Sequence, residues 1–560
     1  MDRPDENDQK QPPRKDRPED KPRKQLDRDP VPPRPGSVNS VQGRILDPST
    51  ALIVEDVVPR PTVYVGQRLL ISKSVDFDVA FEVLRVVADQ LGWDVVPEAE
   101  DPRTVNLRFG FRPVRVEVTN RASIAPDAWT LLQQTRAQYG VDAVKGVSLD
   151  HVVAPAIDSN TIDSDPLHDS NPLHDSNPLH DSNPLHDSNP LHDSNPLHDS
   201  NPAADARGSR AIASYLQIGF GGRQPVAYVG PKPHRCPDDA IAGRRPVVAV
   251  LDTGCGKHPW LDGIVKKKVT LGEDVIGYSD ATSVSPEDDG DQDGPLDGVI
   301  DPLAGHGTFI AGLIRQRCPD ADIISWRVVG SDGPIVESDL VATLAQIAEL
   351  ARRHRAGEKG GHPIDVLSLS MGYYHETPED ALFDPTMYAI LEDMASNGVV
   401  IVCSAGNDGT SRPSFPAAFG RWSDGAGPIP FDPDIAPIVS VGALNPSRHS
   451  DAMFSNAGPW VHVYAPGASV MSTMPAFQGG FEPLARTRAF DRVREAIDPD
   501  DFRGGYAVWS GTSFSAPVIA GTIAAALLNT LESPTEPVDA DSAVTNAWNA
   551  VTACTGLARS

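Results

Sequence analysis

From about residue 245 onward, short runs of apolar and β-branched residues alternate with segments of helical periodicity. Five runs are apolar on both faces, which is typical of strands in a parallel sheet covered by helices: PVVAVLD, ADIISWRVV, PIDVLSLSM, NGVVIVCSA and PIVSVGA. One covering helix is predicted to start at the N-cap candidate Ser338, with Leu340, Leu344 and Ile347 on its buried stripe. Another is predicted in SAPVIAGTIAAALLNT. The pattern predicts an α/β fold with helices on both faces of the sheet.

A smaller unit precedes this half, between residues 62 and 153, and its elements follow the order βαββαβ. The first of its two helices has apolar residues at steps of three and four, which puts them on one face: Phe77, Phe81, Leu84, Ala88 and Leu91. Its second helix is expected after Ala125-Pro126, because proline is tolerated in a first helical turn. The order predicts a small α+β domain of the ferredoxin-like type.

Two segments lack such periodicity. The start of the chain mixes charges of both signs with many prolines and few large apolar residues, so it is predicted to be a disordered tail. Between residues 163 and 198 the hexapeptide Asp-Ser-Asn-Pro-Leu-His runs six times, with Asp165 replacing Asn in the first copy, and this composition predicts a solvated spacer. The predicted organisation is a charged tail over 1–60, the βαββαβ domain over 61–155, a low-complexity linker over 156–210 and the α/β domain over 211–560.

Composition narrows the classes of function. The formal net charge of −28 disfavours nucleic acid and anionic membranes as partners. The five cysteines form no CxxC pair of the kind that zinc sites and redox sites use. No secretory leader is found before residue 50 and no apolar run of about 18 residues occurs later, so a cytoplasmic protein is expected as the sequence stands, with leaderless export left open.

Three short motifs in the α/β half carry candidate chemistry. The first, Asp252-Thr253-Gly254, follows the run VVAVL and therefore lies at the carboxyl end of a predicted strand, where open α/β sheets build their sites. The same tripeptide marks aspartic proteases, which need two such carboxylates. No second DTG or DSG occurs here, so an aspartic protease would require two copies of the chain.

The other two motifs open predicted helices. Gly305-His306-Gly307-Thr308 precedes FIAGLIRQ, and the glycines allow other backbone to approach the histidine. Gly511-Thr512-Ser513 precedes the helix FSAPVIAGTIA, which puts the hydroxyl where helical N–H groups favour negative charge. Each has an ordinary structural explanation alone, since histidines precede many helices and serine is a common N-cap.

Together, the chain order Asp252, His306, Ser513 in these contexts resembles the subtilisin family of serine proteases, over about residues 245–530. The resemblance implies a subtilisin-like parallel sheet, a Ser-His-Asp triad and the hydrolysis of polypeptide substrates. The segment Ser404–Asn407 is similar to the loop on which the family carries its oxyanion asparagine, which implies that role for Asn407.

A further segment, LSMG over residues 369–372, is similar to the edge to which the family's substrates add as an extra strand. The resemblance implies these substrate-binding residues: Ser370, Met371, Gly372, Ala405 and Gly406. No cofactor is required by this chemistry. Calcium is the candidate ion, because the acidic run with Asp289, Asp291 and Asp293 spaces its oxygens as a calcium loop does, although Ile300 stands at the twelfth position instead of glutamate.

The leading βαββαβ unit resembles the family's propeptide, and its ending, Val147–Val152, is similar to that propeptide's last strand. The resemblance implies a self-processing zymogen in which the unit inhibits its own enzyme, with autocleavage between His151 and Tyr215. A separate ligand-binding domain that is never removed remains the alternative for this unit. For the whole chain, the alternatives are a catalytically silent peptide-binding protein and a peptide ligase or cyclase that uses the same acyl-enzyme.

Overall fold

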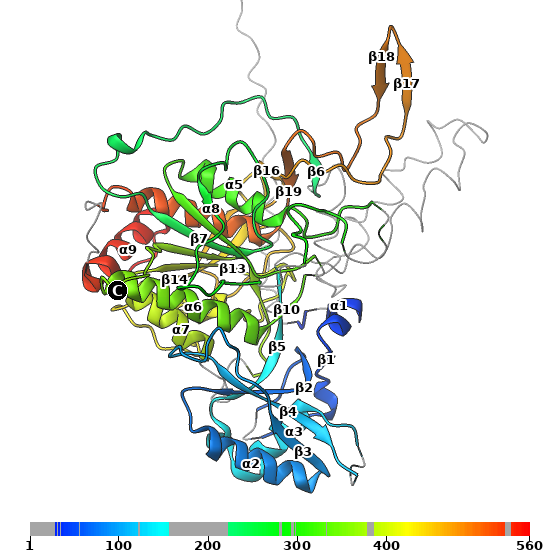
Figure 1. Cartoon of the computed structure of the whole chain (residues 1–560), viewed down its shortest axis with the longest axis vertical. Helices are drawn as coiled ribbons and strands as arrows, with labels where there is room; N and C mark the ends of the chain where they lie inside the picture. Colours follow the sequence, from blue (N-terminus) through cyan, green and yellow to red (C-terminus); the bar gives the residue numbers. More distant parts are fainter. Residues whose placement is uncertain are drawn as a thin grey trace, which may run out of the picture.

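The computed structural model describes residues 28–30, 32–33, 35–54, 57–120, 122, 124–155, 222–278, 283–292, 296, 298–331, 333–377, 386–531 and 539–559. The hexapeptide repeats and most of the predicted tail lie outside the described residues. Within this part, two sheets form the framework, one in an N-terminal domain over residues 35–155 and one in a C-terminal domain over residues 222–559. The N-terminal domain lies at the bottom of Figure 1, below the larger domain.

The C-terminal domain is built on seven parallel strands in the order β15-β14-β13-β11-β7-β9-β8. Their bounds are β7 Val247–Asp252, β8 Val265–Lys266, β9 Asp322–Arg327, β11 Val366–Leu369, β13 Val400–Ser404, β14 Ile438–Leu444 and β15 Val463–Pro466. Every residue of β7, β11 and β13 is buried, as expected for strands that helices cover on both sides. The predicted α/β parallel sheet is therefore confirmed.

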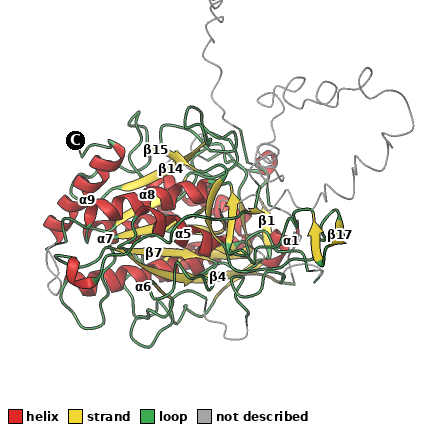
Figure 2. Cartoon of the chain, turned by 90° about the horizontal axis from the view of Figure 1, so that it is seen from above, coloured by secondary structure: helices red, strands yellow, loops and turns green. Residues whose placement is uncertain are grey.

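Helices flank the sheet on both faces (Figure 2). Their bounds are α5 His306–Arg317, α6 Glu337–Arg355, α7 Thr386–Ser396, α8 Thr512–Leu527 and α9 Ala540–Thr555. Helices α5 and α8 pack together, as do α6 and α7. Both α5 and α8 begin near the edge where the parallel strands end. His306, the first residue of α5, lies against Asp252 at the end of β7, and the carbonyl of Ser513 in α8 accepts a hydrogen bond from Ser370, which follows β11. No helix among the described residues has both the length and the apolar character that crossing a bilayer requires.

The N-terminal domain has the predicted βαββαβ order. Its elements are β2 Val63–Ser72, α2 Phe77–Gln90, β3 Trp93–Pro97, β4 Phe111–Val118, α3 Ala128–Tyr139 and β5 Val147–Pro155, with a 3-10 turn at Val141–Val144. The strands are antiparallel in the order β5-β2-β4-β3, and α2 and α3 pack on the sheet through a core that includes Leu84, Trp93 and Leu132. The expected α+β domain is therefore present.

The described secondary structure begins earlier than the predicted domain boundary at residue 61. A short helix, α1 Pro35–Ser40, leads into β1 Gly43–Ile45, which pairs antiparallel with β2, and a 3-10 turn follows at Pro48–Thr50. Leu46 is buried in the domain core, and Arg44 forms an ion pair with Asp127 at 2.9 Å. Sequence analysis placed these residues in the tail because a few apolar positions among charges and prolines give no periodic signal.

The two domains share one sheet. Strand β5 continues beyond β2 and pairs with two short strands of the C-terminal domain, β10 Ile335–Val336 and β12 Met371–Gly372, both antiparallel. Leu70, Phe111 and Val153 of the N-terminal domain belong to the same buried cluster as the core of the larger domain. Because apolar side chains of both domains are buried in one continuous core, the two domains pack as one unit.

The start of α6 corrects one sequence prediction. Helix α6 begins at Glu337, so Ser338 lies inside its first turn and is not the N-cap. The capping group comes from the other domain, where the Asp150 carboxylate accepts hydrogen bonds from the Ser338 backbone N–H at 3.0 Å and from its hydroxyl at 2.9 Å. Burial raises the pKa of Asp150 to about 6, against the lowering effect of the Ser338 N–H and Arg68. A cap from 188 residues away leaves no local sequence signal.

The remaining strands lie at one end of the C-terminal domain. Strands β16 Val470–Thr473, β19 Tyr506–Trp509 and β6 Gln224–Pro225 form a small antiparallel sheet in the order β16-β19-β6. Between β16 and β19, a hairpin of β17 Arg486–Ala489 and β18 Arg492–Glu495 projects away from the body (Figure 1). The last 3-10 turns are Asp238–Ala240 and Ala417–Phe419.

Candidate active site

The first candidate residue, Asp252, ends β7 and is fully buried. Its Oδ1 accepts a hydrogen bond from the Thr253 backbone N–H at 2.8 Å and lies 2.7 Å from Nδ1 of His306. Because a carboxylate only accepts hydrogen bonds, the proton between them belongs to Nδ1, and the second nitrogen of the imidazole, Nε2, is then an acceptor. No described residue bonds to Nε2. The pair has the orientation that a general base needs.

His306 is the first residue of α5, and close backbone contacts hold it there. The N-cap is Gly305, whose φ of 82° lies in the left-handed region that glycine adopts without strain. A side chain on Gly307 would collide with the carbonyl of Gly254, in the turn after Asp252. The two glycines therefore bring the start of α5 directly against the end of β7.

Glu287 joins these two segments, and sequence analysis did not identify it. It is fully buried, and its Oε1 accepts a hydrogen bond from the Gly307 N–H at 3.0 Å and one from the Thr253 hydroxyl at 2.5 Å. Its Oε2 accepts from the Thr308 hydroxyl. Burial raises its pKa, although these hydrogen bonds act in the opposite direction. The carboxylate thereby fixes the residue after Asp252 relative to the residues after His306.

The third candidate, Ser513, lies in the first turn of α8, which starts at Thr512 after Gly511, and it is fully buried. Four residues later, Pro517 has no N–H to donate to the Ser513 carbonyl. The Ser370 hydroxyl donates to that carbonyl instead, at 3.0 Å. The ring of the neighbouring Phe514 lies 5.2 Å from the His306 ring, centroid to centroid, so the start of α8 packs against the imidazole.

Asn407 is also held at the start of α8. Its Oδ1 accepts from both the backbone N–H and the hydroxyl of Thr512, each at 2.9 Å. Because a backbone N–H can only donate, the amide oxygen faces Thr512, and the Nδ2 donors point elsewhere. The loop itself is fixed by Asn456, whose Nδ2 donates to the Ala405 carbonyl at 2.8 Å. A side chain on Gly406 would collide with Asn456.

The edge formed by β12 is occupied in the full chain. Ala154 pairs with Gly372 and Pro155 pairs with Met371, while Val152 and Val153 pair with β10 on the other side. The end of β5 is thus the middle strand of three. It leads toward Ser513, because Ser370, which bonds to the Ser513 carbonyl, directly precedes β12. The chain beyond Pro155 lies outside the described residues.

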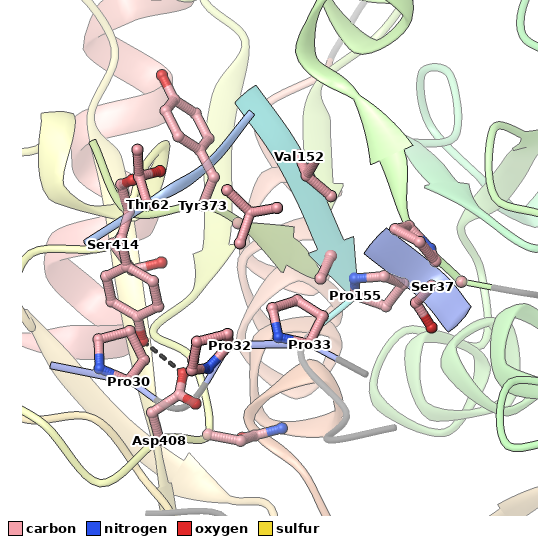
Figure 3. A pocket seen from close by; sticks show the side chains of 18 of the residues that line it. Pro30, Pro32, Pro33, Ser37, Thr62, Val152, Pro155, Tyr373, Asp408 and Ser414 are labelled. Carbon is pink, nitrogen blue, oxygen red and sulfur yellow. Dashed lines mark hydrogen bonds between the residues drawn. The ribbon is translucent and has the colours of Figure 1, made fainter. Parts of the chain in front are cut away.

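A second N-terminal segment, residues 28–30 and 32–33, also lies next to the site. Arg28 donates to the carbonyls of Asp408 at 3.0 Å and Gly409 at 2.8 Å, next to Asn407. A cavity of about 140 Å³ separates this segment from β5, and Pro30, Pro32 and Pro33 line it together with Val152, Pro155 and Asn407 (Figure 3). The three candidate side chains and Asn407 are all buried, and both N-terminal segments lie next to Asn407 in the lining of this cavity.

The predicted calcium loop is only partly described, because Asp293 lies outside the described residues. Asp289 is exposed, and its carboxylate accepts from the Asp291 N–H at 3.3 Å. One oxygen of Asp291 accepts from the Gly298 N–H at 2.5 Å, while Oδ1 is buried without a partner among the described residues. An orphaned buried oxygen is compatible with an ion, so the donor set fits calcium at one of its three positions.

Comparison with known proteins agrees with this geometry. The model of the subtilase family, Peptidase_S8, matches residues 243–551, which is more than half of the chain. The chain belongs to the subtilase family. The suspected resemblance is thereby confirmed over residues 243–551, and the likeness of the N-terminal domain to a propeptide stays a prediction.

Two curated subtilase relatives illustrate the similarity. The intracellular serine protease of Paenibacillus polymyxa is 25% identical over 297 residues, which cover 50% of this chain and 66% of that protein. Mycosin-4 of Mycobacterium tuberculosis is 29% identical over 300 residues, 50% of this chain and 55% of that protein. Each match spans less than two thirds of the relative's own length. Among solved structures, fervidolysin from Fervidobacterium pennivorans aligns over 86% of this chain and 61% of its own at 17% identity, with a TM-score of 0.40.

Proposed function

We propose that this subtilase is a serine endopeptidase that hydrolyses polypeptides through Ser513, His306 and Asp252. The observation that carries the proposal is the buried His306–Asp252 pair, at 2.7 Å, packed against the first turn of the helix that bears Ser513. A serine hydroxyl is a weak nucleophile near neutral pH and needs an adjacent base, and a base needs a partner that fixes its tautomer. Asp252 meets the second need at Nδ1 of His306, and the packing of Phe514 on the imidazole supports Ser513 as the hydroxyl that His306 would activate.

Each residue then has one role. Ser513 Oγ attacks the scissile carbonyl while Nε2 of His306 takes its proton and later gives it to the leaving amine. Asp252 keeps the proton of the resting imidazole on Nδ1 and stabilises the imidazolium. The Asn407 amide and the Ser513 backbone N–H donate to the oxyanion, an assignment supported by the two hydrogen bonds that orient Asn407 on Thr512.

The same geometry supports a zymogen. Strand β5 lies between β10 and β12 as a polypeptide substrate would, and this main-chain pairing accommodates varied sequences. We propose that the N-terminal domain inhibits the enzyme in this way and that the enzyme cuts the chain just after Pro155. This position lies inside the interval from His151 to Tyr215 expected from the sequence.

Calcium at Asp289, Asp291 and Asp293 remains a proposal of its own, supported by the buried Oδ1 of Asp291. Oxygen ligands are what calcium requires, and an ion there would brace the loop that follows Glu287. No step of the proposed reaction uses it.

The test is to express the wild type and Ser513→Ala side by side, together with Asp541→Asn, an exposed position in the first turn of α9, as a surface control. We expect fragments with new N-termini shortly after residue 155 from the wild type and the control, and a full-length chain from Ser513→Ala. The processed wild type should then cleave a mixed peptide library. Equal full-length bands and equal library products from wild type and Ser513→Ala would contradict the proposal.

A further inference from the structure

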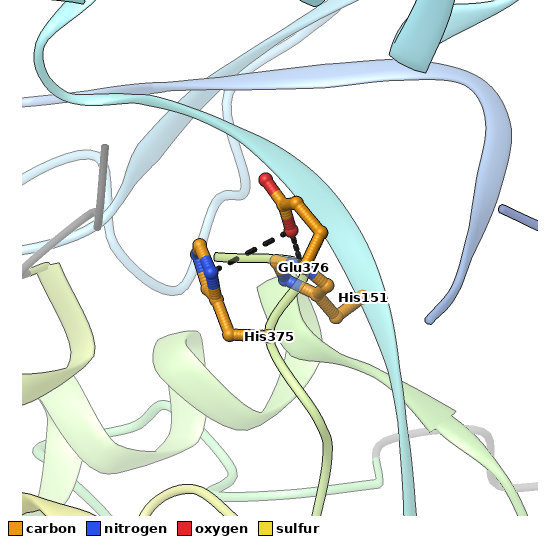
Figure 4. Close-up of side chains that lie close together, drawn as sticks. All are labelled: His151, His375 and Glu376. Atoms are coloured by element: carbon orange, nitrogen blue, oxygen red, sulfur yellow. Dashed lines mark hydrogen bonds and ion pairs between the residues drawn. The ribbon is translucent and has the colours of Figure 1, made fainter. Parts of the chain in front are cut away.

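A buried ionic cluster lies at the interface of the two domains, outside the proposed triad. The His151 imidazole is placed between two carboxylates, with Nδ1 at 2.6 Å from Glu337 and Nε2 at 2.8 Å from Glu376. Its ring stacks on Tyr373 at 4.8 Å between centroids, and the Tyr373 hydroxyl donates to Glu337 at 3.1 Å. Figure 4 shows His151 extending from β5 toward Glu376 and His375.

This cluster holds a cation and not a metal. Both ring nitrogens of His151 lie against carboxylate oxygens, which can only accept hydrogen bonds, so both nitrogens carry protons and neither has a lone pair for a metal. Burial alone would lower the pKa of His151, but Glu337 and Glu376 raise it to about 10. The imidazole is therefore an imidazolium near neutral pH.

The register of β5 against β10 and β12 fixes the position of His151 relative to a bound substrate strand. Strand β5 has the place of a substrate strand, with Val152 opposite Val336 and Pro155 opposite Met371. Every residue of a bound substrate strand would occupy the place of its counterpart in β5. The residue four positions before the one opposite Met371 would consequently enter the place of His151.

Removal of the N-terminal domain changes the charge balance of this place. Among the described residues, the cations paired with the two carboxylates are His151 and Arg136, which lies 3.6 Å from Glu376, and both belong to the N-terminal domain. The neighbouring His375 is neutral near neutral pH, because burial lowers its pKa to about 3. Glu337 and Glu376 would be left as two adjacent carboxylates in a largely buried setting, which favours binding of a new cation.

We propose that Glu337, Glu376 and Tyr373 form an acidic subsite that selects polypeptides with lysine, arginine or protonated histidine four residues before the residue opposite Met371. The inference rests on the proposed peptidase function and names its substrate class. A cationic side chain there gains charge-assisted hydrogen bonds from the carboxylates and a favourable contact with the Tyr373 ring. A neutral or acidic side chain leaves the two carboxylates without a cation between them.

The test uses the processed enzyme and peptides with the chain's own sequence over residues 147–160. Four peptides carry His, Lys, Gln or Glu at the position of residue 151, and kcat/KM is measured for each at pH 7. We expect the Lys peptide to exceed the Gln peptide by about tenfold or more, because one charge-assisted hydrogen bond to a buried carboxylate discriminates by at least that factor, and the Glu peptide to be poorest.

Variants of the enzyme test whether Glu337 and Glu376 cause the preference for the Lys peptide over the Gln peptide. The ratio of kcat/KM for the Lys and Gln peptides is measured within each protein, so differences in the active fraction cancel. We expect this ratio to fall toward one in Glu337→Gln/Glu376→Gln. It should be retained in Asp393→Asn, a matched control, because Asp393 pairs with Arg108 of the same N-terminal domain at 2.8 Å but away from β5.

Equal rates for the Lys and Gln peptides in the wild type, or an unchanged ratio in the double variant, would overturn the subsite. Cleavage of all four peptides with no preference refutes the subsite and leaves the peptidase proposal standing. Absence of cleavage of any peptide by wild type, matching Ser513→Ala, refutes the peptidase proposal itself. The two failures are therefore distinguishable.

Discussion

Association of the two domains should weaken steeply as the pH rises, because of His151. In the separated N-terminal domain we expect its pKa near the ordinary value of about 6.5, whereas the two glutamates raise it to about 10 in the complex. A raised pKa contributes stability that is complete below about pH 6.5 and is lost as the pH rises through 10. Between pH 7 and pH 9 the dissociation constant should rise roughly 50- to 100-fold.

Other groups at the interface do not produce this slope. Burial raises the pKa of Asp150 to about 6, so its contribution is present below about pH 4 and is already lost by pH 7. Burial would raise the pKa of Glu376, but His375, His151 and Arg136 hold it well below its ordinary value, so it stays ionised from pH 7 to 9. His375, with its pKa lowered to about 3, stays neutral throughout this range.

The assay uses residues 1–155 and 211–560 as two co-expressed chains, with Ser513→Ala to prevent digestion. Dissociation constants are measured by calorimetry at pH 7, 8 and 9. His151→Gln should bind more weakly at pH 7 and lose the pH slope, while Asp393→Asn should bind more weakly at every pH and keep it. If the dissociation constant of the parent complex did not change with pH, or if its pH dependence persisted in His151→Gln, the role given to His151 would be refuted.

The remaining predictions concern the proposed catalytic centre and its ion. Glu287→Ala leaves buried hydrogen-bond donors unpaired, so kcat should fall by at least about tenfold while KM stays within a few fold. Glu287→Gln should restore part of this loss. Equal kcat in the wild type and both variants would show that Glu287 does not position the site. Asn407→Ala should lower kcat by about 10²–10³, the cost of one oxyanion donor in this enzyme class, with little change in KM, and a loss in KM alone would exclude the role. If calcium binds, EDTA should lower the melting temperature by at least about 3 °C in wild type and not in Asp291→Asn; identical shifts would exclude this site.

Sequence alone predicted the framework of the C-terminal domain because its signals are local. Parallel strands covered on both faces read as continuous apolar runs, and VVAVLD became a fully buried strand. The glycines around His306 marked close backbone approach, which is how Gly307 meets Gly254. Asp252 and His306 could therefore be placed at the end of a strand and at the start of a helix from the residues next to them in the sequence.

The parts that sequence missed depend on contacts between distant residues. Glu287 lies 20 residues before Gly307, just ahead of the acidic run that begins at Asp289, and only folding brings it to the start of α5. The cap of α6 comes from Asp150, and the cation between Glu337 and Glu376 comes from His151, 186 residues away from Glu337. Pairing across a domain interface has no periodicity, so these roles could not be read from one chain segment.

Labelling with a fluorophosphonate tests the central claim most directly, because this probe reacts with a serine only where a base activates it. The processed wild type is treated with the probe at pH 8, digested and analysed by mass spectrometry. The account predicts a single adduct, on Ser513, that is lost in His306→Ala and strongly reduced in Asp252→Asn. A processed protein without an adduct on Ser513, or labelling of Ser513 that persists unchanged in His306→Ala, would contradict it.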